Sequence, residues 1–354
     1  MSRPLISARV LAAYPDVIAE IGGSAVVPHG FAAAGLPMQI AGRQDIFMPE
    51  LGLAALVEAC ARRLGDRDFG LRLTERLDIS GYGAWGHYLL GAPSLGEALH
   101  RLGKAMRYHA SHDAFRVQRT GDELRLSYGL SVAGCVGARH LAPQPVQLLG
   151  SLIRRYVGAE WRPLRVELST PRPPRPTVYE DLFQCPVLFD KPAEAIVIER
   201  ERAGCNGWPT TRAGLVSLSD LRRIVNRRAP KGMADGIRET IRMRLFDGEV
   251  DIDGVAASLG LGSRTLQRRL VDEGTTFRGL LAQVRTERAR ELLVETETPI
   301  IQIALDLGYS SSTHFARAFR KRTGLPPSRF RSMSNVSQAD GHAIVATPSD
   351  QPCR

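Results

Sequence analysis

Cysteine is scarce in this chain, and its spacing supports neither a disulfide framework nor a zinc site. The five cysteines are odd in number, and no two form a Cys-x-x-Cys pair: Cys60, Cys135, Cys185, Cys205 and Cys353. Disulfide scaffolds pair nearly all of their cysteines, and structural zinc sites need four closely spaced ligands. We therefore expect no metal and no other cofactor, and a reducing compartment such as the cytoplasm.

Long apolar runs and export signals are also absent. No run approaches the ~18 apolar residues that a membrane span requires. Near the N-terminus, Asp16 and Glu20 interrupt the apolar positions before an export-type core can form. The expected location is the cytoplasm, with no membrane partner.

Three common catalytic signatures are missing, which argues against an enzyme. The chain has no Gly-x-x-x-x-Gly-Lys-Ser/Thr loop, no His-Glu-x-x-His pair and no Gly-x-Ser-x-Gly turn. His109 and His112, followed by Asp113, could bring two imidazoles together at a helix end, but no third metal ligand has a recognisable spacing. A methyl-accepting DNA-repair domain would need a cysteine cluster before Lys231, and none is present.

Basic residues are in excess, and their placement is informative. Lys and Arg number 47 against 37 Asp and Glu, which gives a formal net charge of +10 and favours a polyanionic partner. The stretches Ser263 to Val271 and Ser311 to Gly324 together contain seven basic side chains and no acidic one. These two stretches are therefore candidate nucleic-acid contacts.

The stretch from about 298 to 324 has the pattern of a helix-turn-helix. Thr298 suits a helix N-cap and Pro299 the first helical position. Apolar residues then follow at helical spacing and precede a glycine: Ile300, Ile303, Ala304, Leu307 and Gly308. After a turn, Ser311 and Ser312 offer a second N-cap, and Phe315 and Phe319 form the inner stripe of a basic second helix. Such a second helix enters the DNA major groove.

The same pattern occurs upstream, at about 251 to 273. Five residues repeat the apolar positions and the glycine at an offset of 48: Ile252, Val255, Ala256, Leu259 and Gly260. After the turn the offset is 49, so Leu266 matches Phe315 and Arg268 matches Arg317. A helix predicted from about Phe277 to Glu295 would hold the two units at a fixed separation.

These residues resemble the AraC/XylS transcriptional regulators over about Met233 to Ser332. The most specific matches are A-A-S-L-G-L-G-S-R-T-L-Q-R-R-L from Ala256, I-A-L-D-L-G-Y-S-S-S-T-H-F-A-R-A-F-R-K-R-T-G from Ile303, and P-S-R-F-R from Pro327. Gly262 departs from the family, which usually has a serine N-cap there. The resemblance implies promoter DNA as a partner, RNA polymerase as a second, and possible homodimers; whether transcription is activated or repressed is not evident.

The resemblance and the exposed first turns of the two recognition helices select the DNA-contact residues. Residues expected to contact bases are Arg264, Gln267, Arg268, Ser312, Thr313 and Arg317. Residues expected to contact phosphates are Arg269, Arg320 and Lys321. Arg suits guanine and Gln suits adenine, while Ser and Thr are less selective.

The first half of the chain mixes helical and strand patterns, so we expect an α+β domain followed by an all-α DNA-binding domain. Helices are predicted over about 50–64, 94–108 and 145–157, a hairpin over 115–128, and short strands over 164–168, 187–189 and 195–198. Three runs resemble the effector-binding domain, named for arabinose, of one AraC-type subgroup: residues 61–73, 91–99 and 182–198. The resemblance implies a small-molecule effector, without making arabinose the ligand.

Six aromatic residues of this domain could line an effector cavity, or could equally be ordinary core and surface: Tyr82, Trp85, His87, Tyr88, Tyr108 and His112. The expected division is a flexible start (1–16), an effector-binding and possible dimerisation domain (17–202), a linker with a short helix near 219–228 (203–230), the DNA-binding domain (231–334) and a disordered tail (335–354). The alternative is an architectural or non-specific DNA-binding protein without effector control, which would leave the first domain without a role.

Overall fold

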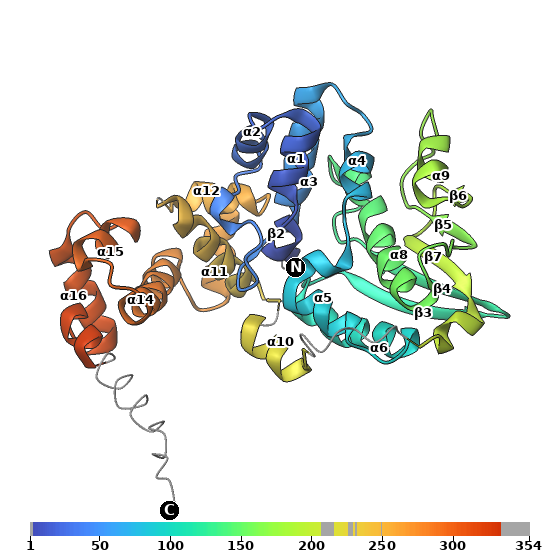
Figure 1. Cartoon of the computed structure of the whole chain (residues 1–354). Coiled ribbons are helices and arrows are strands. Elements are labelled where there is room, and N and C mark those ends of the chain that lie inside the picture. The colour runs from blue at the N-terminus through green and yellow to red at the C-terminus, as the bar shows by residue number, and fades with distance from the viewer. Residues whose placement is uncertain (1–2, 207–215, 226–228, 231, 249, 334–354) are drawn as a thin grey trace, which may run out of the picture.

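The computed structural model describes residues 3–206, 216–225, 229–230, 232–248 and 250–333. An N-terminal α+β part contains the sheets, and a C-terminal part is wholly helical (Figure 1). The expected fold class is confirmed. The predicted tail, 335–354, lies outside the described residues, as does part of the predicted linker.

The start of the chain is a structural element and not a loose end. β1 (Leu5–Ser7) pairs antiparallel with β2 (Phe47–Pro49), with Ile6 opposite Met48. A 3-10 turn and α1 (Tyr14–Gly22) follow, and Leu5 and Tyr14 are fully buried. The prediction of a flexible segment over residues 1–16 is therefore wrong for residues 5–16, because burial of these apolar side chains holds the segment in the core.

The first part contains eight further α-helices among the described residues. They are α2 (Val26–Ala33), α3 (Glu50–Leu64), α4 (Phe69–Glu75), α5 (Gly83–Leu90), α6 (Leu95–Ala105), α7 (Ala138–Leu141), α8 (Pro143–Val157) and α9 (Thr177–Phe183). The helix predicted over 50–64 is confirmed, and Ser94 caps α6 by accepting a hydrogen bond from Glu97 N at 3.3 Å. α6 ends at Ala105, and a 3-10 turn continues to Tyr108.

A five-stranded sheet has the order β3-β4-β7-β5-β6. Its strands are β3 (Ala114–Thr120), β4 (Glu123–Gly129), β5 (Arg165–Glu167), β6 (Val187–Leu188) and β7 (Glu194–Glu199). β5 and β6 are parallel and the other neighbours antiparallel, which confirms the predicted hairpin and short strands. α8 packs against β7. Leu126 of β4 and Ile196 of β7 are buried in the core.

The C-terminal part is built from seven helices over the described residues. They are α10 (Leu218–Val225), α11 (Met233–Arg244), α12 (Ile252–Ser258), α13 (Ser263–Asp272), α14 (Phe277–Glu295), α15 (Ile300–Asp306) and α16 (Ser312–Thr323). The predicted bounds of α14 are confirmed. Thr298 does not cap α15: the N-cap is Pro299, which has no side-chain acceptor, while the Thr298 hydroxyl accepts a hydrogen bond from Thr296 Oγ1 at 3.0 Å.

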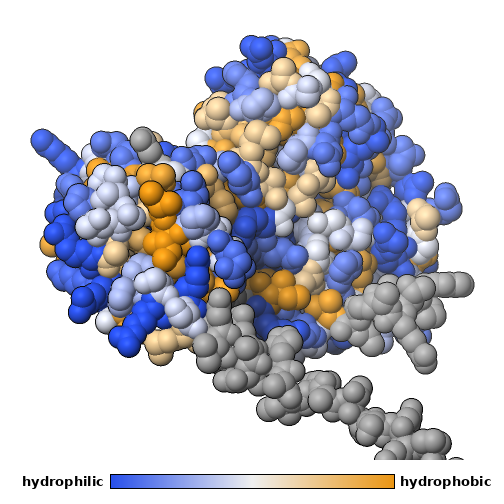
Figure 2. Space-filling model, turned by 60° about the vertical axis from the view of Figure 1, so that its left-hand side comes forward, coloured by the Kyte–Doolittle hydropathy of each residue, from blue (hydrophilic) through white to orange (hydrophobic). Residues whose placement is uncertain are grey.

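The two parts are packed against each other. α11 lies on β2, and α10 lies on α5 (Figure 1). Arg3 donates to the carbonyl of Gly260 at 2.9 Å, joining the start of the chain to the turn between α12 and α13. Seen with the C-terminal helices turned forward, the surface is mainly hydrophilic, and apolar residues form only small groups (Figure 2).

Candidate nucleic-acid interface and ligand cavity

The first helix-turn-helix is formed by α12 and α13. Asp251 caps α12 by accepting a hydrogen bond from Gly254 N at 2.7 Å. Gly260, with φ 62°, makes the turn in a left-handed conformation that favours glycine. Gly262 is the N-cap of α13 and provides no side-chain hydrogen bond, as its departure from the family pattern predicts. Leu266 and Leu270 are buried and hold α13 against its neighbours.

The second unit repeats this arrangement with a stronger cap. Gly308, with φ 72°, ends α15, and Ser311 caps α16 by accepting a hydrogen bond from His314 N at 3.2 Å. The rings of Phe315 and Phe319 are both buried, with centroids 5.7 Å apart. The predicted inner stripe and serine cap of the second recognition helix are therefore confirmed.

The long helix α14 joins the units rigidly. Arg242 of α11, with 7% of its side chain exposed, forms ion pairs with Glu287 at 3.2 Å and Glu291 at 3.5 Å. At the other unit, Arg285 donates to the Gly308 carbonyl at 3.1 Å and lies over the Tyr309 ring. Polar contacts from α14 thus reach the second unit directly, and reach the first unit through α11, which packs against α12 and α13.

The side chains predicted to contact DNA lie mostly on the open surfaces of α13 and α16. Five of the six predicted base-contact residues are exposed, namely Arg264, Gln267, Arg268, Thr313 and Arg317, and Ser312 is half-buried. Of the predicted phosphate contacts, Arg320 and Lys321 are exposed and Arg269 is half-buried. Sequence reasoning did not select His314, which is exposed on the first turn of α16 with Nδ1 2.9 Å from Ser310 Oγ.

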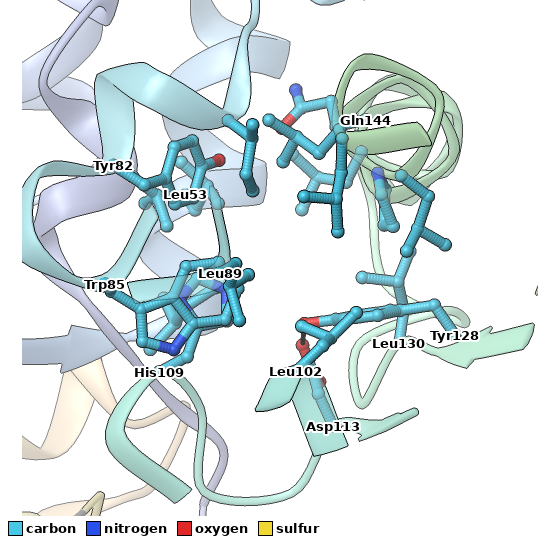
Figure 3. Close-up of a pocket in the computed structure, with 18 of the residues that line it drawn as sticks. Leu53, Tyr82, Trp85, Leu89, Leu102, His109, Asp113, Tyr128, Leu130 and Gln144 are labelled. Atoms are coloured by element: carbon cyan, nitrogen blue, oxygen red, sulfur yellow. Dashed lines mark hydrogen bonds between the residues drawn. The ribbon is translucent and has the colours of Figure 1, made fainter. Parts of the chain in front are cut away.

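A cavity lies inside the N-terminal part, between the β1–β2 ribbon, α3, α5, α8 and β4. Figure 3 shows Tyr82, Trp85 and His109 on one side and Tyr128 on the other, with Asp113 below. The volume of the cavity is about 60 Å³, enough for about five water molecules. The cavity is therefore suited to a small molecule.

Two carboxyl groups face this cavity. Glu50 is 1% exposed and forms no hydrogen bond of good geometry with the described residues, although Asp113 and Ser131 lie near enough to influence its pKa. Asp113 is well satisfied: it accepts from Tyr128 Oη at 2.6 Å and from Ser131 N at 3.0 Å. Burial, followed by the charge of Asp113, raises the pKa of Glu50 well above its ordinary value. Burial therefore favours the neutral form of the Glu50 carboxyl group.

Aromatic rings form the opposite wall. Trp85 and His109 are stacked with centroids 4.7 Å apart, and Tyr82 lies 5.8 Å from His109. His109 Nδ1 is buried without a hydrogen-bond partner among the described residues. Burial, then the nearby guanidinium of Arg9, lowers the pKa of His109 to about 3, so its ring is neutral near pH 7.

Of the six residues expected to line an effector cavity, the structure brings only Tyr82 and Trp85 to this one. His87 and His112 are exposed. Tyr88 is buried beneath Arg101, whose guanidinium lies 5.2 Å from its ring. Tyr108 is buried, and its hydroxyl accepts from Arg222 Nε at 3.0 Å. These four side chains do not line this cavity because neighbours along a helix or turn point in different directions.

Sequence analysis did not assign Glu50, Tyr128 and Gln144 to the cavity, and it considered His109 and Asp113 only as possible metal ligands. Glu50 offered one signal, as an acidic residue between the apolar pairs Met48-Pro49 and Leu51-Gly52.

Within the described residues there is no group of His, Cys, Asp or Glu able to hold a metal ion. No described helix is both long and apolar enough to cross a membrane.

Comparison with known proteins agrees with this geometry. The family model for the N-terminal arabinose-binding domain of the AraC transcription regulator matches residues 27–205, and a helix-turn-helix domain model matches residues 255–333. The chain belongs to the AraC-type transcription regulators. It is a DNA-binding regulator of transcription, and its relatives are regulators and not enzymes.

Two relatives of this AraC-type regulator span nearly its whole length. The ornithine utilization regulator of Pseudomonas aeruginosa is 27% identical, covering 89% of this chain and 93% of its own. The regulator VirS of Mycobacterium tuberculosis is 25% identical, and the match covers 94% of this chain and 98% of VirS. Among solved structures, the transcriptional regulator CdpR of Pseudomonas aeruginosa is 26% identical over 74% of this chain and 86% of its own, with a TM-score of 0.35.

Proposed function

We propose that this AraC-type regulator is controlled by a small-molecule effector bound in the cavity of its N-terminal part. The observation that carries the proposal is the β1–β2 ribbon, which the cavity and the DNA-binding helices share. Ile6 lines the cavity. Its neighbour Leu5 faces Gly236 of α11. A Cβ atom added to Gly236 would lie 3.8 Å from Leu5 Cδ1, which is van der Waals contact. Successive strand residues point to opposite faces of the strand. A shift of the ribbon would therefore move both the cavity wall at Ile6 and the contact of Leu5 with α11.

A second connection supports the same coupling. The Tyr108 carbonyl accepts from Arg9 Nη2 at 3.1 Å, and its hydroxyl accepts from Arg222 of α10. Next to it, the Arg107 carbonyl accepts from Ala229 N at 2.7 Å. Arg9 lies beside the cavity ring of His109, whose pKa it lowers. Movement around a ligand would therefore reach α10, the helix that precedes the DNA-binding part.

DNA reading is assigned to the exposed turns of α13 and α16. In this proposal Arg264, Gln267 and Arg268 contact bases in one major-groove segment, and Ser312, Thr313 and Arg317 contact bases in the next. Arg269, Arg320 and Lys321 contact phosphates. The support is that Arg264, Gln267, Arg268, Arg317, Arg320 and Lys321 are exposed and that no acidic residue lies within either recognition stretch.

The remaining partners follow from this role. A regulator at a promoter acts by recruiting or obstructing RNA polymerase, and the N-terminal part is the candidate surface for a homodimer. We place the protein in the cytoplasm, on the nucleoid when it is bound to DNA. These assignments rest on the regulator family and on the basic helices.

The proposal is tested by measuring DNA affinity with and without an effector found by a thermal-shift screen of metabolites. We expect the effector to change operator affinity by about 5- to 150-fold, the usual size of allosteric coupling. Operator DNA must then change effector affinity by the same factor. An effector that binds the cavity but leaves DNA affinity unchanged would contradict control at the level of DNA binding.

A further inference from the structure

We infer that the cavity accepts a small organic cation: a ligand with a short apolar body and one protonated nitrogen, held at Glu50 and Asp113. This deepens the proposed function, since it names the ligand class of the same cavity and rests on that cavity being the effector site. The inference comes from the combination of a buried acid without a hydrogen bond of good geometry, a second acidic side chain and an aromatic wall.

The apolar lining of the cavity indicates that most of the ligand is apolar. Most side chains that face the space are aliphatic and come from several elements, among them Ile6, Leu53, Leu89, Leu102, Leu130 and Leu149. A sugar carries a hydroxyl on nearly every carbon, and each hydroxyl buried without a partner would cost free energy. The two acidic groups of the lining, Glu50 and Asp113, lie close to each other, so they suit one charged end of a ligand and not a polar rim.

The charge of the ligand is set by the acids. Two carboxyl groups that face one buried space repel each other when both are ionised, and a cation between them removes that cost. Glu50 is 1% exposed and its oxygens have no hydrogen bond of good geometry, so an ammonium group could bind them by displacing only the weaker approach of Asp113 and Ser131. Its neighbour Asp113 is a second acidic side chain, already held in place by hydrogen bonds from Tyr128 and Ser131.

The opposite wall also favours a cation. Tyr82 and Trp85 present rings to the cavity with centroids 6.0 Å apart, and ring faces attract positive charge. The neutral His109 ring leaves Nδ1 without a partner, available to a polar hydrogen of the ligand. An anionic ligand would meet two carboxyl groups and gain nothing from these rings.

The test uses the full chain and matched pairs of small probes: isoamylamine against isoamyl alcohol, and benzylamine against benzyl alcohol, with L-arabinose as the sugar. Each pair has the same shape and differs in the charged nitrogen. Binding is followed by melting temperature and by tryptophan fluorescence, because Trp85 lines the cavity. We expect at least one amine to bind more tightly than its alcohol, by on the order of tenfold or more, and arabinose not to bind.

Glu50→Gln is the decisive variant. The amide has the shape of the neutral acid, so the variant should melt close to wild type without ligand, yet lose the preference for amine over alcohol. Glu167→Gln is the control: it removes another buried carboxylate, 7% exposed, that does not line the cavity, and should keep the preference. Equal binding of amine and alcohol, no binding of any amine, or amine binding that survives Glu50→Gln would overturn the inference.

The outcomes also separate this inference from the proposed function. Tight amine binding that depends on Glu50 but leaves DNA affinity unchanged would support the ligand class and contradict effector control. A change of DNA affinity caused by a neutral or anionic molecule bound in the cavity would do the reverse.

Discussion

At the scale of single residues, Arg268 and Lys321 are both exposed cations on a recognition helix, yet we expect them to act differently on DNA. Arg268 is assigned to a base edge and Lys321 to a phosphate. Arg268→Ala should cost about 1–3 kcal/mol on the specific site and relax the preference at one position. Fluorescence anisotropy with specific and random duplexes measures both quantities.

Lys321→Ala provides the comparison for that prediction. It should weaken binding to all sequences alike and reduce the slope of log affinity against log salt by about one unit. If the two variants lose the same affinity on specific and on random DNA, the division between base and phosphate contacts is wrong.

His109 gives a prediction for pH. Its pKa falls from an ordinary value of 6.5 to about 3 on folding, so between these values the unfolded chain holds a proton on the ring that the folded chain does not. Stability attributable to His109 is therefore complete above about pH 6.5 and is lost on acidification, by a few kcal/mol across the window.

The measurement is the free energy of unfolding of wild type and His109→Phe between pH 7 and pH 5. Phenylalanine keeps a ring beside Trp85 but cannot bind a proton, so the wild type should lose stability relative to the variant as pH falls. Glu50, whose raised pKa acts in the opposite direction, is common to both proteins and cancels in the difference. A difference that does not change with pH would show that His109 is not kept neutral by burial.

At the scale of elements, α15 contains its own matched control. Ile303 is fully buried under α16, while Ile301, two residues earlier in the same helix, is 60% exposed. Ile303→Asp places an unpaired carboxylate in the core, at a cost of several kcal/mol. DNA binding should fail through local unfolding of the second unit, seen as a lower melting temperature and reduced helical circular dichroism. Ile301→Asp should leave melting nearly unchanged.

The elements that were predicted well are those decided by local chemistry. α14 and the two helix-turn-helix units depend on helical spacing, caps and glycine turns, all readable within about twenty residues. The ribbon was missed because its strands are three residues each and pair over more than forty positions, from Leu5 to Pro49. A short strand gains its stability from distant partners, which a sequence pattern does not contain.

The cavity illustrates the same limit. Tyr82 and Trp85 line the cavity, since aromatic residues in a mostly apolar segment face inward, and their contact with an effector stays a prediction. Glu50 and Asp113 are more than sixty positions apart, and only the folded ribbon and sheet bring them together. The four other aromatic candidates do not line this cavity, because composition marks a segment but not the direction of each side chain.

At the scale of the whole molecule, the contact between Tyr108 and Arg222 should transmit effector binding. Tyr108→Phe removes the hydroxyl that accepts from Arg222 Nε while keeping the buried ring. It should leave effector affinity and DNA affinity each close to wild type when measured alone, and reduce the factor by which one ligand changes the affinity of the other. Calorimetry of the effector with and without operator DNA gives this factor, and an undiminished value would exclude the α10 route.

The most direct test of the central claim is selection of binding sites by the full chain from random duplex DNA. Two helix-turn-helix units held apart by α14 predict a site with two specified segments, separated centre to centre by about one helical turn, roughly 10 base pairs. Arg268→Ala should weaken the base preference in one segment, and Arg317→Ala should weaken it in the other. Selection without any preferred sequence, or a weaker preference at the same positions in both variants, would contradict the reading of DNA by two separate helices.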